Sequence, residues 1–332
     1  MRVAVTRGRR IRTRRRVTTA VLAVAVVCGI VITGTLAPRK PDPTTPLPAP
    51  DPSESALRAD NLGVLPDAIG QPGASARPDL VATDRRVVHF SVDAIANGAR
   101  RVTWTSNADY ESANVQRQDF QAYIAVARRA DVFPTKDDFV TSSRTTLSAT
   151  APVTIGGRPG TAAHSADGWI WSLRWQPVAG LWANVQVQTP TLDRALEVAE
   201  TVRFDQAKEC ALPFSMGKPS GQSTLQSCET SLDADLFGGL FANGRLVFAD
   251  GQKRLEISTM DAHDGGGDYP RHLKAGPHLA WADPDGKSWT MLVKPVFFTA
   301  TVTPKHAYTQ QQVLDALGTV RMAVDPDNPS TW

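Results

Sequence analysis

The chain has 332 residues, of which 42% are hydrophobic and 21% charged, a composition typical of a folded protein and not of a disordered or fibrous one. Its net charge of +3 is unevenly distributed, because residues 1–16 contain eight arginines and no acidic residue. The rest of the chain has 36 − 8 = 28 basic and 33 acidic residues and is therefore negatively charged. Because this mildly acidic remainder does not extend a basic surface, the sequence predicts no nucleic-acid partner.

An uncharged, mostly apolar segment follows the arginines at residues 17–37. As a helix it would be about 32 Å long, close to the roughly 30 Å hydrocarbon thickness of a bilayer. Arginine-rich flanks stay in the cytoplasm. We therefore expect a basic cytoplasmic tail at 1–16, a transmembrane helix at 17–37, and a single-pass cell-membrane protein whose bulk is extracytoplasmic. The alternative is a cleaved signal peptide, for which residues 35–37 resemble a weak cleavage site.

A linker is predicted from residue 38 to residue 79. Residues 38–52 contain seven prolines, and polar sequence with glycine and proline continues behind them. Proline fixes φ and lacks a donor, so this stretch is expected to be extended. The first folded unit is then expected at residues 80–208.

Four of the eight tryptophans lie in residues 168–187. Alternation of large apolar side chains, followed by a turn and a second alternating run, predicts a β-hairpin, and the apolar stripe after it predicts a helix packed on that hairpin. Trp169, Trp171 and Trp175 are accordingly expected in the core. Trp182 falls on the polar face of the hairpin, where it is either covered by a neighbouring segment or an exposed contact residue.

An internal repeat relates residues 155–204 to residues 273–322, with twelve of fifty positions identical at a shift of 118. The matched residues make turns, fill cores and line helices, which favours two copies of one unit. We expect a second unit at 209–324 and a tail at 325–332. The predicted fold class is α+β: two related units, each an antiparallel sheet closed by a C-terminal helix, after an N-terminal transmembrane helix.

Two cysteines, Cys210 and Cys228, lie in the part expected outside the cell. A pair in an oxidising compartment predicts a disulfide, which would tie the junction between the two copies. A zinc site is the weaker alternative, because the sequence has no CxxC pattern and no histidine pair nearby.

The sequence contains no recognisable catalytic or phosphate-binding motif, so no catalytic residue, cofactor or metal ligand is predicted and the chain is expected not to be an enzyme. Asp261–Asp268 is the best candidate for a cation site, with three aspartates and His263 on a glycine-rich loop. Its spacing fits no known cation-binding loop, which favours a solvated loop.

The arrangement of basic tail, apolar segment and proline-rich spacer, together with the stretches VTIGGRPG, WSLRW, LWANVQV and ALEVAETVRF, resembles membrane-anchored proteins of actinobacteria. The repeated unit is similar to the sheet-plus-helix ectodomains of LolA- and anti-sigma-type proteins and to PsbP/Mog1-like lipoproteins. The resemblance implies a non-catalytic binding or sensing module. A tail of sixteen residues is too short for a sigma-binding domain, which departs from the anti-sigma pattern.

We therefore expect a membrane-anchored, extracytoplasmic binding or scaffold protein of the cell envelope, with an envelope protein, a lipid or a cell-wall component as partner. The alternative is a cell-envelope hydrolase whose active site assembles from residues far apart in the sequence.

Overall fold

The computed structural model describes residues 64–133, 147–219, 221–234, 240–261, 272–293, 296–326 and 328–332. The predicted basic tail and transmembrane segment lie outside these residues, as does most of the predicted linker. Among the described residues no helix is long and apolar enough to cross a membrane. The prediction of a single-pass membrane localisation is corrected accordingly, because the described helices have at most nine residues.

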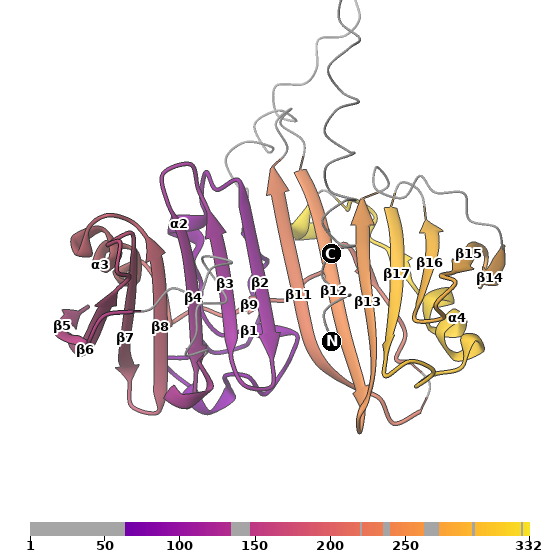
Figure 1. Ribbon diagram of the computed structural model, residues 1–332, viewed down its shortest axis with the longest axis horizontal. Helices are drawn as coiled ribbons and strands as arrows, with labels where there is room; N and C mark the ends of the chain where they lie inside the picture. Colours follow the sequence, from indigo (N-terminus) through magenta and orange to yellow (C-terminus); the bar gives the residue numbers. More distant parts are fainter. Residues whose placement is uncertain are drawn as a thin grey trace, which may run out of the picture. The chain divides into compact units, whose positions relative to one another are not determined.

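One antiparallel sheet of fourteen strands dominates the structure (Figure 1). Residues Arg101–Asn107 and Val296–Thr303 alternate between buried and more exposed positions, as expected for strands with one apolar face, whereas Gln121–Ala127 is buried at six of its seven positions. In spatial order they are β14 (Leu273–Ala275), β15 (His278–Ala282), β16 (Ser288–Val293), β17 (Val296–Thr303), β13 (Lys253–Asp261), β12 (Leu240–Asp250), β11 (Thr224–Ala234), β2 (Arg101–Asn107), β3 (Glu111–Gln116), β4 (Gln121–Ala127), β8 (Leu181–Gln188), β7 (Ile170–Val178), β6 (Arg158–His164) and β5 (Ala151–Ile155).

The remaining elements are short. Two small antiparallel pairs join β1 (Val87–Val88) to β9 (Lys208–Glu209) and β10 (Phe214–Ser215) to β18 (Arg321–Met322). The helices are α2 (Asp93–Ala96), α3 (Leu192–Glu200) and α4 (Gln310–Gly318), with 3-10 turns at Pro78–Leu80, Ala130–Val132 and Pro329–Thr331.

The predicted fold of two related α+β units, each closed by its own helix, is wrong. Strand β2 of the first half pairs with β11 of the second over seven residue pairs, from Asn107 opposite Ser227 to Arg101 opposite Asp233. The backbone groups of both strands find partners in this way, whereas two separate sheets would each leave an edge unpaired. The chain therefore builds one continuous sheet with few helices.

Each half of the sheet has its own buried cluster of apolar side chains. Phe90, Trp104 and Leu173 belong to the first cluster, and Ile257 and Phe298 to the second. Helix α3 lies against β5, β7 and β8, while α4 lies against β14, β16 and β17. Both helices begin at a threonine cap, which satisfies backbone N–H groups of the first turn.

The predicted hairpin is confirmed, because β7 and β8 pair across a tight turn. Trp175 is 3% exposed and Trp171 is partly buried, as expected for the inner face. The prediction for Trp169 is wrong: it is 55% exposed. It stands one residue before β7 begins, in a turn where its backbone N–H donates to Asp167, so strand alternation does not govern its side chain.

The two ends of the sheet are formed by short strands. β14 has three residues, and β5 has five with Pro152 opposite Thr161. Proline lacks a backbone donor and is tolerated at sheet edges. Both ends thus present few backbone groups for further pairing.

We predict that Trp175→Ala lowers the free energy of unfolding by about 3–5 kcal/mol, because it removes a large side chain from the core and leaves a cavity. Trp169→Ala, in the same hairpin, should cost less than about 1 kcal/mol because that ring already contacts solvent. Urea unfolding followed by circular dichroism measures both values. Equal losses for the two variants would contradict the burial seen here.

Candidate functional site

A buried carboxylate organises the loop between the 3-10 turn at Pro78–Leu80 and strand β1. Glu111, the first residue of β3, is 0% exposed. It accepts hydrogen bonds from the backbone N–H of Ala82 at 2.7 Å and of His89 at 2.6 Å. The His89 Nδ1 atom lies 2.7 Å from Glu111 Oε1. One carboxylate therefore holds Ala82, near the start of the loop, and His89, just after β1, and hydrogen bonds to an ionised group are the strong ones.

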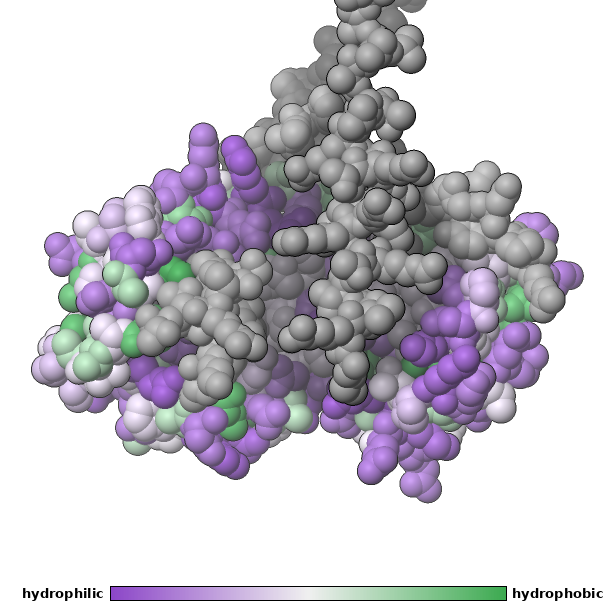
Figure 2. Space-filling model, viewed as in Figure 1, coloured by the Kyte–Doolittle hydropathy of each residue, from purple (hydrophilic) through white to green (hydrophobic). Residues whose placement is uncertain are grey.

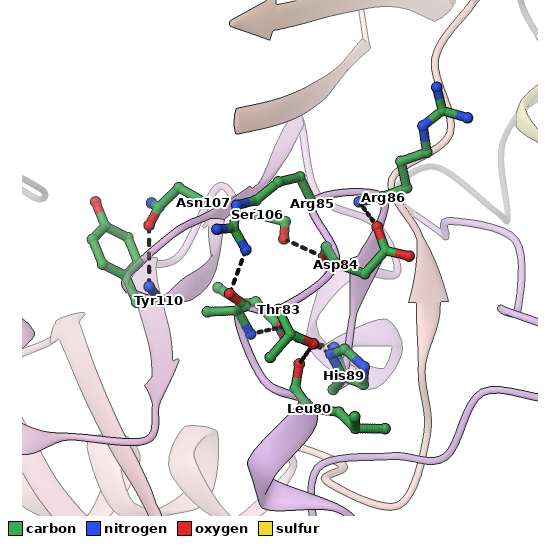
Figure 3. A network of polar contacts seen from close by, with 11 residues as sticks. Leu80, Thr83, Asp84, Arg85, Arg86, His89, Ser106, Asn107 and Tyr110 are labelled. Carbon is green, nitrogen blue, oxygen red and sulfur yellow. Dashed lines mark hydrogen bonds and ion pairs between the residues drawn. The ribbon is translucent and has the colours of Figure 1, made fainter. Parts of the chain in front are cut away.

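The loop has a sharply defined backbone. Ala82 adopts a φ of 60°, a conformation that non-glycine residues rarely adopt, and its N–H is held by Glu111. The guanidinium of Arg85 donates to the Ala82 carbonyl, and the hydroxyl of Ser106 donates to the Asp84 carbonyl at 3.2 Å (Figure 3). Asp84 in turn accepts from the backbone N–H of Arg86 at 2.8 Å. The loop is thus fixed by bonds inside it and by one from β2.

A groove of about 560 Å³ lies between this loop and the beginning of β11, within the ~300–1,000 Å³ typical of ligand sites. Thr83, Asp84, Arg85 and Arg86 form one wall, and Thr224–Gln226 form the other. We call this hollow the arginine groove.

The two arginines of the groove differ in what they contact. Arg85 is half-buried, and its Nε has no hydrogen-bond partner among the described residues. Arg86 is exposed, its side chain extends away from the loop network in Figure 3, and it makes no ion pair with any residue that the structure describes. The loop wall therefore offers two cations against one carboxylate, that of Asp84, which already accepts a backbone hydrogen bond. Guanidinium groups of this kind suit carboxylate or phosphate.

The disulfide joins the segment behind the loop wall to β11, the strand that forms the other wall. Cys210 and Cys228 are bonded, and both are buried. The backbone N–H of Cys210 donates to the Arg86 carbonyl at 2.7 Å, while Cys228 belongs to β11, two residues after Gln226. The bond therefore holds the segment behind the loop wall against the strand that forms the other wall.

Lys208, two residues before Cys210, fixes the same segment. Its buried ammonium lies 2.8 Å from a carboxylate oxygen of Asp67 and 2.6 Å from one of Asp93. Burial lowers the pKa of Lys208, but hydrogen bonds and charge from the two aspartates outweigh burial and hold the pKa above its ordinary value. Because the pKa is raised in the folded state, this stabilisation is present at neutral pH and is lost only as the pH rises through the folded pKa.

A second hollow of about 290 Å³ is lined by Ala108, Asp109, Arg128, Arg129 and Val132. Arg129 is paired with Asp131 there. This hollow is smaller than the arginine groove, and part of its positive charge is neutralised.

The residues singled out from the sequence do not form one site. The disulfide of Cys210 and Cys228 borders the arginine groove, whereas Trp182 lies on β8 and packs beside a buried cluster with Tyr123 and Phe133. That Trp182 contacts a partner stays a prediction. Of the proposed cation loop, residues 262–268 lie outside the described residues, and within the described ranges no group of three potential ligands could hold a metal ion.

Sequence reasoning missed Arg85, Arg86 and Glu111. The run Asp84-Arg85-Arg86 between two apolar stretches was the available signal for a charged loop, but such runs are common on surfaces. Glu111 had a weaker signal, as a single acid at the start of a strand.

No protein-family model and no curated protein matches the chain. Among solved structures it is similar to MucB in complex with MucA(peri), at 11% identity and a TM-score of 0.20 over 67% of this chain and 92% of that one. The Pseudomonas aeruginosa MucA/MucB complex is similar at 11% identity and a TM-score of 0.22, over 75% of this chain and 98% of that one. MucB alone is similar at 11% identity and a TM-score of 0.21, over 74% of this chain and 96% of that one. Similarity at this level carries no argument about fold or function.

Glu111→Gln should lower the free energy of unfolding by about 1.5–3 kcal/mol. In the wild type both carboxylate oxygens accept a hydrogen bond from a backbone N–H, and in the variant the amide NH₂ faces one of these N–H groups and cannot accept from it. Glu200→Gln is the matched control: Glu200 is exposed and accepts one backbone N–H at 3.1 Å, so its loss should stay within about 0.5 kcal/mol. Thermal unfolding compares the two variants. If Glu111→Gln is as stable as the control, Glu111 does not organise the loop.

Removing the disulfide in Cys210→Ala/Cys228→Ala should lower the free energy of unfolding by about 3 kcal/mol, since the bond closes a loop with a sequence separation of 18. Denaturant midpoints with and without reductant measure this. Reductant should destabilise the wild type to the level of the variant and leave the variant unchanged. If reductant leaves the denaturant midpoint of the wild type unchanged, the prediction is wrong.

Proposed function

We propose that the chain is a non-catalytic, extracytoplasmic binding protein that holds an anionic partner in the arginine groove. The observation that carries this proposal is the position of Arg86: exposed, without an ion pair among the described residues, and on a wall fixed by a buried carboxylate. A preorganised wall loses little conformational freedom on binding, which favours affinity.

The disulfide supports the extracytoplasmic part of the proposal. Bonds such as that between Cys210 and Cys228 persist in oxidising compartments and are rare in the cytosol, where thiols are kept reduced. Because this bond holds the segment behind the loop wall against β11, it joins the two elements that bear the groove.

The surface supports a polar partner over a lipid. On the face drawn in Figure 2 the described residues are mostly hydrophilic, and hydrophobic ones are scattered in small patches. Lipid-binding surfaces need a contiguous apolar patch. The wall residues Thr83, Thr224 and Gln226 instead offer hydroxyl and amide groups.

The groove gives the hydrolase alternative no support. His89 is 1% exposed, and its Nδ1 is bonded to Glu111, so this imidazole is not presented to a substrate. The Thr83 hydroxyl donates to the Leu80 carbonyl at 2.6 Å and is not paired with a base. General-base catalysis requires a base within reach of the nucleophile.

The test is retention of a partner from envelope extracts by the full chain and by charge variants. Arg86→Glu should reduce the amount of retained partner at least tenfold, because it reverses the charge that meets the anion. Arg158→Glu is the matched control, an exposed arginine in β6, six strand positions from β11 and thus on the order of 30 Å away. Equal retention by both variants, or a retained fraction independent of salt, would contradict the proposal.

A further inference from the structure

The geometry points to a specific class of ligand for the groove: we infer that it binds an extended acidic peptide, whose backbone pairs with Thr224–Gln226 and whose carboxylates bind at Arg86, beside the positive charge of Arg85. This inference rests on the proposed function and names the chemistry of its partner.

The wall formed by β11 is a strand that lacks one neighbour. On one side β11 pairs with β12 from Thr224 onward, but on the other side its pairing with β2 begins only at Ser227, opposite the last residue of β2. Residues 224–226 therefore extend beyond β2, and on that side they have no paired strand among the described residues. Backbone groups of a strand point alternately to its two sides, so part of this segment faces the groove.

An irregularity in β11 falls within the same three residues. Leu225 lies opposite Phe248 and Ser227 opposite Val247, so Gln226 is an extra residue without a counterpart in β12. Such bulges leave backbone groups unpaired and redirect side chains, and they are over-represented next to functional sites. Addition of a peptide strand to an open strand segment is a common mode of recognition, in which main-chain hydrogen bonds give affinity and side-chain contacts give specificity.

The opposite wall sets the charge of the peptide. Arg86 makes no ion pair among the described residues and can bind a carboxylate. Arg85 already donates to the Ala82 carbonyl and its Nε is buried, so it adds positive charge beside Arg86. The β11 wall contributes Thr224, Leu225 and Gln226 and no charge. In an extended peptide, side chains two residues apart lie on the same side at roughly 6.6–6.8 Å spacing, so alternating acidic residues present their carboxylates to the loop wall.

A free inorganic anion would make fewer contacts with the groove than a peptide does. Phosphate can bind the arginines, but it cannot pair with the backbone of residues 224–226. A lipid likewise offers no strand to pair with that backbone. The peptide uses both walls.

The experiment measures binding of fluorescent hexapeptides to the full chain by anisotropy at low and physiological salt. The probe alternates glutamate with valine; one comparison peptide replaces glutamate by lysine, and another carries N-methyl groups on alternate backbone nitrogens. We expect the acidic peptide to bind, the N-methylated one at least tenfold more weakly, and the lysine peptide not at all. Arg86→Gln should weaken binding of the acidic peptide at least tenfold, while Arg158→Gln should leave it unchanged.

Three outcomes would overturn the inference. Equal affinity for the acidic and N-methylated peptides would show an anion site without strand pairing, as would competition by inorganic phosphate at concentrations comparable to the peptide. Absence of peptide binding, while Arg86→Glu still removes the partner retained from extracts, would reject the peptide and leave the proposed function standing. Loss of that dependence on Arg86 would instead reject the proposed function.

Discussion

The pairing of β2 with β11 is the interaction on which the rest of the structure depends. It joins segments more than a hundred residues apart and turns two sets of strands into one sheet. Because β2 ends at Asn107 while β11 reaches back to Thr224, the same pairing also leaves a segment of β11 without a neighbour. The position of the groove is thus a consequence of the register between these two strands.

The groove is built outward from the core. Glu111 lies on the buried face of β3 and accepts hydrogen bonds from the backbone N–H groups of Ala82, in the loop, and His89, just after β1. Burying a carboxylate is costly unless it is hydrogen-bonded, and three close polar contacts offset that cost here. The left-handed conformation of Ala82 is tolerated for the same reason. Arg86 can then remain without an ion pair among the described residues, because Glu111, Arg85 and Ser106 already fix the loop.

Local elements of this fold could be predicted from the sequence, because they are encoded by neighbouring residues. Alternation identified the hairpin of β7 and β8, and the apolar stripe that follows it identified α3. The disulfide between Cys210 and Cys228 could be predicted because these are the two cysteines in the part of the chain expected in an oxidising compartment. Trp169 was misplaced because alternation does not show where a strand begins. The single sheet could not be predicted, since pairing between β2 and β11 has no local signature, and neither could the groove, whose walls are far apart in the sequence.

The two edge strands of the sheet affect whether sheets of separate molecules can pair with each other. A sheet of fourteen strands has two edges at which a strand of another molecule could pair. At one edge β14 is only three residues long, and at the other Pro152 removes a donor from β5. Both features discourage growth of the sheet into filaments. Residues 224–226 of β11, which have no paired strand on one side among the described residues, are bordered by Arg85 and Arg86 instead, and charged side chains beside an open strand discourage unselective pairing.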